Sequence, residues 1–185
     1  LLDLHHQIGS NLLMVMPGAP RTPGVRPSAG SMKSLKVSDY EAISKLDGVK
    51  AASPMTNGSY VVIYQNKNWT TSVSGVSYNY LDVNNWSMKS GRFLSEKNVQ
   101  NRERVAVVGK TVVKNLFGDE DPVGAEIRVK NIPFRIIGVL NSKGSGAMGN
   151  DQDDMVIIPY TTAMERVEGI DYLRMIYVVG KDENG

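Results

Sequence analysis

The chain has 185 residues, of which 41% are apolar and 22% charged, so it falls in the range of globular proteins and is long enough to bury a core. Its 21 Lys and Arg against 19 Asp and Glu give a net charge of +2 with both signs interleaved, which excludes the clustered basic face that nucleic-acid or anionic-lipid binding requires. The absence of cysteine excludes disulfides, thiolate metal sites and cysteine nucleophiles.

The first residues indicate a piece of a longer protein. Residues 1–8 have neither an initiator Met nor the basic and apolar regions of a signal peptide, so we interpret them as an internal start. Leu1, Leu4 and Ile8 share one face at helical spacing, which predicts the last turns of a helix that Gly9 ends. No stretch reaches the roughly 18 to 20 apolar residues that span a bilayer.

A short strand, a long loop and a helix are expected next. Residues 11–16 are apolar after Asn11 and predict a short buried strand. Residues 17–34 contain Pro and Gly at seven positions and few large apolar side chains, which predicts a flexible loop. Ser38 followed by Glu41 forms a capping-box pattern, which predicts a helix from there to Gly48.

The remaining elements are short and mixed. Apolar, β-branched and aromatic segments predict strands at 49–52, 60–64, 69–76, 104–108, 125–129, 134–140, 155–158 and 173–179. Helical patterns are found at 78–83, from Ser95, at 111–117 and at 161–167. Because strands and helices follow no steady βαβ rhythm, the fold class predicted is α+β.

A glycine motif in the loop 143–154 has the spacing of a dinucleotide-binding fingerprint. Gly144, Gly146 and Gly149 follow a predicted strand, as that fingerprint requires. The last glycine should then open a helix whose N–H groups hold the pyrophosphate. Here it leads into the acidic stretch 150–154 and a strand, and the carboxylates would repel a phosphate. Nucleotide binding is therefore not predicted.

Two other candidate sites lack the sequence pattern that metal binding requires. Asp151, Asp153 and Asp154 lack the central Gly and distal Glu of an EF-hand, so we interpret them as fixing the loop by hydrogen bonds to backbone N–H groups. His5 and His6 are adjacent and would point about 100° apart on a helix, which does not suit one metal ion. We assign no catalytic, cofactor-binding or metal residue and expect no cofactor.

Several short motifs run in order across nearly the whole chain. They are Ile8-Gly9-Ser10-Asn11-Leu12-Leu13, Gly48-Val49-Lys50, Gly91-Arg92-Phe93, Phe117-Gly118-Asp119-Glu120-Asp121-Pro122-Val123-Gly124, Ile137-Gly138-Val139-Leu140 and Asp151-Gln152-Asp153-Asp154 before Ile158-Pro159. In order and spacing they resemble the MacB-like extracytoplasmic core domain of ABC transporter permeases.

The resemblance implies a two-lobed α+β domain. Residues 1–74, with the flexible loop 17–34, would form the first half of a porter-like lobe of strand-helix-strand units. Residues 75–170 would form an inserted α+β lobe. Residues 171–185 would begin the return to the porter-like lobe, whose second half is absent from this chain.

The resemblance also implies a non-catalytic role on the extracytoplasmic side of the plasma (inner) membrane. ATP hydrolysis on separate cytoplasmic nucleotide-binding domains would drive a permease homodimer, and this domain would pass the motion to a membrane-fusion adaptor protein or a substrate. The alternative is a binding module that captures a peptide, lipid, lipoprotein or antibiotic. For either role, the exposed loops 17–34 and 143–154 are the first places to look for contacts.

Overall fold

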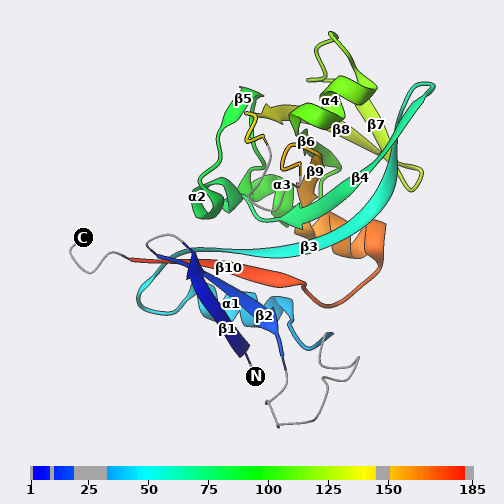
Figure 1. Ribbon diagram of the computed structural model, residues 1–185. Helices are drawn as coiled ribbons and strands as arrows, with labels where there is room; N and C mark the ends of the chain where they lie inside the picture. Colours follow the sequence, from blue (N-terminus) through cyan, green and yellow to red (C-terminus); the bar gives the residue numbers. More distant parts are fainter. Residues whose placement is uncertain (1, 9–10, 19–32, 145–150, 182–185) are drawn as a thin grey trace, which may run out of the picture.

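The computed structural model describes residues 2–8, 11–18, 33–144 and 151–181, which form a mixed ten-stranded sheet with short helices (Figure 1). The strands are β1 (Leu2–Ile8), β2 (Leu12–Pro17), β3 (Val49–Tyr64), β4 (Lys67–Val76), β5 (Met88–Gly91), β6 (Val105–Val108), β7 (Glu126–Val129), β8 (Ile132–Leu140), β9 (Met155–Pro159) and β10 (Met175–Gly180). The helices are α1 (Val37–Ser44), α2 (Tyr80–Asn84), α3 (Glu96–Gln100), α4 (Lys110–Leu116), α5 (Tyr160–Thr162) and the π-helix η2 (Ala163–Glu168). The predicted α+β class is confirmed.

The strand order places a strand from the C-terminal part beside strands from the N-terminal part. The order is β1-β2-β10-β3-β4-β9-β6-β8-β5, with β7 pairing both β3 and β8. β10 lies between β2 and β3 and pairs antiparallel with both. The pairs β4 with β9 and β6 with β8 are parallel, and the other pairs are antiparallel. β3 contributes to both halves of the sheet, since it pairs with β10 over its first residues and with β4 over the rest.

The buried apolar side chains of the described residues fall into three clusters. One lies under α1, where Ile43 packs with Leu173 and Ile176 from the C-terminal part. A second lies between α4 and strands β3, β4, β6, β8 and β9. The third gathers around α2, where Tyr80 and Val83 are buried. In Figure 1, α1 lies on one side of β3 and β10, and α2, α3 and α4 lie on the other.

Local sequence signals explain the helix ends in the second half of the chain. Ser95 caps α3, because its hydroxyl accepts a hydrogen bond from the N–H of Asn98 at 3.1 Å. Gly118 follows α4 with φ of 61°, a left-handed conformation that glycine adopts without steric cost. Both helices were predicted from these residues, and the hairpin of β7 and β8 turns at Lys130 and Asn131 as predicted.

Two predictions near the N-terminus are wrong. Residues 2–8 form strand β1 instead of a helix, because they pair antiparallel with β2, with His5 opposite Met14. α1 starts at Val37 and ends at Ser44, short of Gly48. Its first turn is closed by Asp39, whose carboxylate accepts a hydrogen bond from the N–H of Lys36 at 2.8 Å, instead of by the predicted Ser38 and Glu41 pair.

Two further elements differ from prediction. The predicted strands 49–52 and 60–64 are parts of one 16-residue strand, since β3 continues through Pro54 and Gly58. The helix predicted over 161–167 becomes a π-helix from Ala163 onward, ended by Gly169 in the left-handed conformation. None of the helices in the described ranges has the length and hydropathy needed to cross a membrane.

Candidate functional site

Three aspartates before β9 fix a loop to three separate elements. Asp151 accepts a hydrogen bond from the hydroxyl of Thr111 on α4 at 2.6 Å. Asp153 binds the chain that follows β8, and Asp154 binds two side chains of β4. The interpretation that these residues fix the loop by hydrogen bonds to backbone N–H groups is confirmed for Asp151 and Asp153, whereas Asp154 bonds to side chains. No group of three or more His, Asp or Glu within the described ranges is arranged to hold a metal ion.

Asp153 is the most buried of the three, with 5% of its surface exposed. Burial by itself would raise the pKa of this carboxyl, but the hydrogen bonds that it accepts outweigh burial and hold the pKa below its ordinary value. The donors are the hydroxyl of Ser142 at 2.6 Å and the backbone N–H groups of Lys143 at 2.7 Å and Gly144 at 3.1 Å. The charge of Lys110 adds to this effect. The ionised carboxylate therefore holds the residues that follow β8 in place.

Gly109 allows the loop to approach the start of α4. A Cβ atom at this position would lie 2.2 Å from the carbonyl oxygen of Asp153, far inside van der Waals contact. The N–H of Thr111 donates to that same carbonyl at 3.2 Å. The close approach of the two backbones thus depends on glycine at position 109.

A hollow of about 330 Å³ opens beside this loop. Its walls combine aromatic and methionine side chains with polar groups and three charged ones. They come from β3, β4, α2 and its following residues, the two ends of the loop, β9 and β10: Met55, Ser72, Ser74, Tyr80, Asn84, Trp86, Lys143, Asp151, Gln152, Asp154, Met155 and Tyr177. A second hollow of about 490 Å³ is also lined by Trp86, and Leu81, Ala51 and Val179 contribute apolar surface there.

The aromatic walls are held rigidly. Trp86 donates its indole N–H to the carbonyl of Asn141 at 2.8 Å. Tyr80 is buried and lies edge-to-face with Tyr177 at 5.9 Å between ring centroids, and burial raises the pKa of both phenols. These phenols therefore stay neutral at physiological pH and act as apolar and hydrogen-bonding surface.

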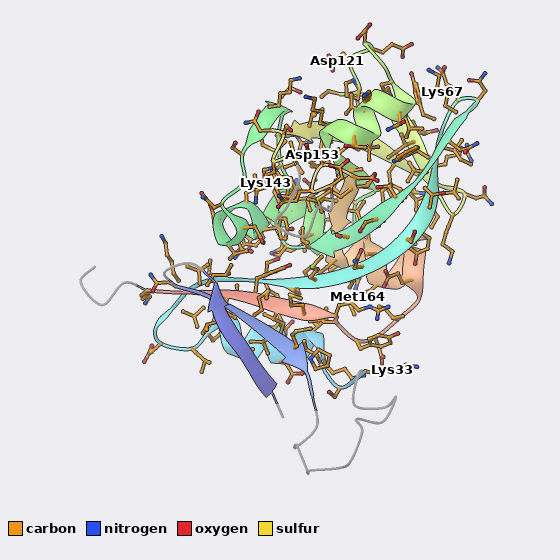
Figure 2. All side chains as sticks on the ribbon, in the orientation of Figure 1. Lys33, Lys67, Asp121, Lys143, Asp153 and Met164 are labelled. Atoms are coloured by element: carbon orange, nitrogen blue, oxygen red, sulfur yellow. The ribbon has the colours of Figure 1, made fainter. Side chains whose placement is uncertain are left out.

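Lys143 lies over the indole of Trp86. Its ammonium is 4.5 Å from the ring centroid and donates a hydrogen bond to the carbonyl of Asn84 at 3.0 Å. Burial lowers the pKa of this ammonium. Figure 2 shows Lys143 and Asp153 close together, in agreement with the hydrogen bond that the backbone N–H of Lys143 donates to the Asp153 carboxylate. A cation held on an aromatic face is a favourable contact.

The structure brings together some of the residues that the sequence singled out. Asp151 and Asp154 line the hollow, while Asp153 binds Gly144 at the loop's other end. Gly146, Gly149 and most of the loop 17–34 lie outside the described residues, as do the side chains of His5 and His6. No local pattern predicted that Trp86, Tyr80 and Tyr177 would meet there, because only the packing of α2 on β10 brings them together.

Comparison with known proteins decides the family. The model of the MacB-like periplasmic core domain matches residues 2–184. The chain belongs to this family. The crystal structure of the periplasmic region of MacB from Actinobacillus actinomycetemcomitans has the same fold, with a TM-score of 0.79 and 27% identity over 95% of this chain and 77% of that one.

Two curated relatives are also named MacB. The macrolide export ATP-binding/permease protein MacB of Rhodospirillum rubrum is 44% identical over 168 residues, which is 90% of this chain and 25% of that protein. Its counterpart in Chlorobium luteolum is 37% identical over 179 residues, 96% of this chain and 27% of that protein. The MacB-like chain therefore spans about a quarter of the length of these relatives. The extracellular domain of the transporter YknZ shares the fold, with a TM-score of 0.70 and 19% identity.

Proposed function

We propose that this MacB-like chain is the extracytoplasmic domain of an ABC-type export permease and transmits motion, driven by ATP hydrolysis elsewhere, to a partner outside the membrane. The observation that carries the proposal is the family match over residues 2–184, together with relatives whose names state macrolide export and ATP binding. The chain would act without an active site of its own. It would lie on the outer face of the inner or plasma membrane.

The continuous sheet supports a mechanical role. β3 pairs with β10 from Val49 to Met55 and with β4 from Met55 to Tyr64, so Met55 joins both halves of the sheet. Two buried hydroxyls reinforce this point: Ser53 accepts a hydrogen bond from the N–H of Ser77 at 3.1 Å, and Thr56 accepts one from Gly75 at 3.2 Å. A displacement of one half would therefore be passed to the other through backbone hydrogen bonds instead of a flexible linker.

The division into lobes at 1–74, 75–170 and 171–185 belongs to the same proposal. The cluster under α1 supports it in part, since Leu35 and Ile43 pack there with Leu173 from the last segment. Val62 and Val73 pack instead with the cluster around α4, so β3 and β4 would be shared between the lobes. Hydrogen exchange tests the division: two sets of amides with distinct opening free energies are expected, divided near residues 74 and 171.

The partners follow from the proposed role. The permease would work as a homodimer, with nucleotide-binding domains on the cytoplasmic side and a membrane-fusion adaptor protein outside. The loop ends around Lys143 and Asp151 are exposed and anchored, which suits a contact surface. Charge reversal at these positions is expected to weaken adaptor binding in a pull-down with the full permease.

Deletion of the domain tests the proposal. In the full-length permease, removal of residues 2–184 is expected to abolish export while ATP hydrolysis and membrane insertion persist. Export would be followed as macrolide resistance of a sensitive host that also expresses the adaptor. Leu46→Ala, at an exposed side chain two residues after the end of α1, is the control and should leave resistance unchanged. Full resistance without the domain would refute the proposal.

A second candidate function is a substrate-binding module. The hollow beside Trp86 favours it, because rigid aromatic walls with a few polar groups are typical of ligand sites. The ligand could be a peptide, lipid, lipoprotein or antibiotic. Binding and mechanical transmission are compatible, since a ligand held between α2 and β10 would be moved by the sheet.

A further inference from the structure

We propose that the hollow beside Trp86 binds a cationic amphiphile, with the apolar body against Trp86 and Met55 and the positive charge toward Asp151 and Asp154. The biological meaning of such a site rests on the proposed export function, but the binding itself does not. The geometry, the charge balance and the position of Lys143 support it independently.

The apolar part of the site is preformed. Trp86 is fixed by its hydrogen bond to Asn141, and Tyr177 is fixed by its edge-to-face contact with Tyr80. Met55 and Met155 add flexible, polarizable surface that adapts to ligand shape. A ligand would therefore bury apolar area without ordering these aromatic side chains, which lowers the entropic cost of binding.

The charge balance selects the sign of the ligand. Two carboxylates, Asp151 and Asp154, line the hollow against one ammonium, Lys143. The hydrogen bonds that the carboxylates accept come from neutral donors, namely hydroxyls, an indole and a backbone N–H, and neither has an ion-pair partner among the described residues. The hollow therefore has a net negative charge in a protein whose net charge is +2. A positive ligand is attracted and a negative one is not.

Lys143 occupies the face of Trp86 against which the apolar body of the ligand would lie. Its ammonium lies on the face of Trp86, which shows that this indole accepts a cation in its present orientation. The lysine competes with the ligand both by occupying the ring and by charge repulsion. Replacing Lys143 with an apolar side chain of similar length should therefore strengthen the binding of a cation, a gain that a merely structural role would not produce.

Two ions of nearly equal shape and opposite charge test the site. The 185-residue chain would be titrated with tetraphenylphosphonium and with tetraphenylborate by calorimetry, and quenching of tryptophan fluorescence would follow binding near Trp86. The phosphonium ion is expected to bind and the borate is not. Binding should weaken as salt is raised from about 50 to 500 mM, because the charge contribution is screened.

Four variants sharpen the result. Lys143→Met should tighten phosphonium binding several-fold, and the double variant Asp151→Asn with Asp154→Asn should weaken it about five- to tenfold, as expected for two partly exposed charges. Trp86→Leu should remove the quenching and most of the affinity. Asp119→Asn replaces an exposed carboxylate that does not line the hollow and should leave phosphonium binding unchanged. Circular dichroism would verify that each variant is folded.

The outcomes that overturn the inference are distinct from those that overturn the export function. Equal binding of the two ions, or an affinity for phosphonium that Lys143→Met leaves unchanged or lowers, would exclude a cation site here. Neither result bears on whether deletion of the domain abolishes export. Conversely, export that survives the deletion would refute the transport role and leave the binding data standing.

Discussion

The carboxylate of Asp154 accepts a hydrogen bond of 2.9 Å from the indole N–H of Trp69, 85 residues away in the sequence. The same oxygen accepts a bond of 2.7 Å from the hydroxyl of Thr71. Asp154 immediately precedes β9, and both donors lie on β4, with which β9 pairs in parallel. One carboxylate thus fixes the start of a parallel pair that has no hairpin to set its register.

Removing this acceptor should lower the stability of the fold. Asp154→Ala leaves the indole N–H of Trp69 without its partner, and we expect a loss of about 1 to 3 kcal/mol in the free energy of unfolding. Asp154→Asn retains an acceptor oxygen and should lose less than half as much. Urea unfolding followed by circular dichroism measures both. If the alanine variant unfolds within about 0.5 kcal/mol of the parent, the hydrogen bonds do not stabilise this pairing.

Gly109 should not tolerate a side chain. In Gly109→Ala the new methyl group would meet the carbonyl of Asp153 at 2.2 Å, so the loop or α4 must move. A loss of about 1 to 3 kcal/mol is expected. Gly180→Ala is the matched control, since the nearest atom there is 3.6 Å away. Thermal melts of both variants distinguish the positions, and equal melting temperatures would show that Gly109 is not under this constraint.

Acid should release the loop that Asp153 holds. Because the pKa of this carboxyl is lowered in the folded protein, its contribution to stability is present above the unfolded value near 4 and is lost as pH falls through the folded pKa. Asp153→Asn lacks this titration. The difference in melting temperature between parent and variant should therefore be larger at pH 6 than at about pH 2.5. A constant difference would mean that Asp153 does not titrate differently on folding.

Glu168 should show the opposite dependence. Burial raises the pKa of this carboxyl, although the charges of Arg174 and Lys130 act against the increase. A raised folded pKa favours folding below the unfolded value, and that advantage is lost as pH rises through the folded pKa. Glu168→Gln is neutral throughout, so it should gain stability relative to the parent between about pH 4 and pH 7. A parallel pH profile for the two proteins would contradict this.

Helix ends and turns that depend on neighbouring residues were predicted from the sequence. Ser95 begins α3, Gly118 follows the end of α4, and the polar pair Lys130 and Asn131 turns a hairpin, because each acts on its own neighbours. β1 was not predicted, since its leucines also fit a helix and only the pairing with β2 makes it a strand. The continuation of β3 through Pro54 and Gly58 likewise depends on β10 and β4 as partners.

The candidate site was likewise predictable only where its contacts are local in the sequence. Asp151 and Asp153 in the acidic stretch were correctly interpreted as fixing the loop through backbone N–H groups, because their donors lie close by in the sequence. Trp69 and Thr71, the distant partners of this stretch, were not predictable, because they depend on the parallel pairing of β4 with β9. The contact of Lys143 with Trp86 depends on how α2 packs, and no local sequence pattern predicts it.

The position of β10 constrains how the chain folds. This strand is the last one in the described sequence, yet it lies between β2 and β3, which are formed from some of the first residues. β2 and β3 have no direct pairing with each other, so on emergence from the ribosome both present open edges until residues 175–180 arrive. Strands β3 to β9 can associate earlier. We therefore expect closure of the N-terminal half to come late in folding, because it depends on contacts of long sequence separation.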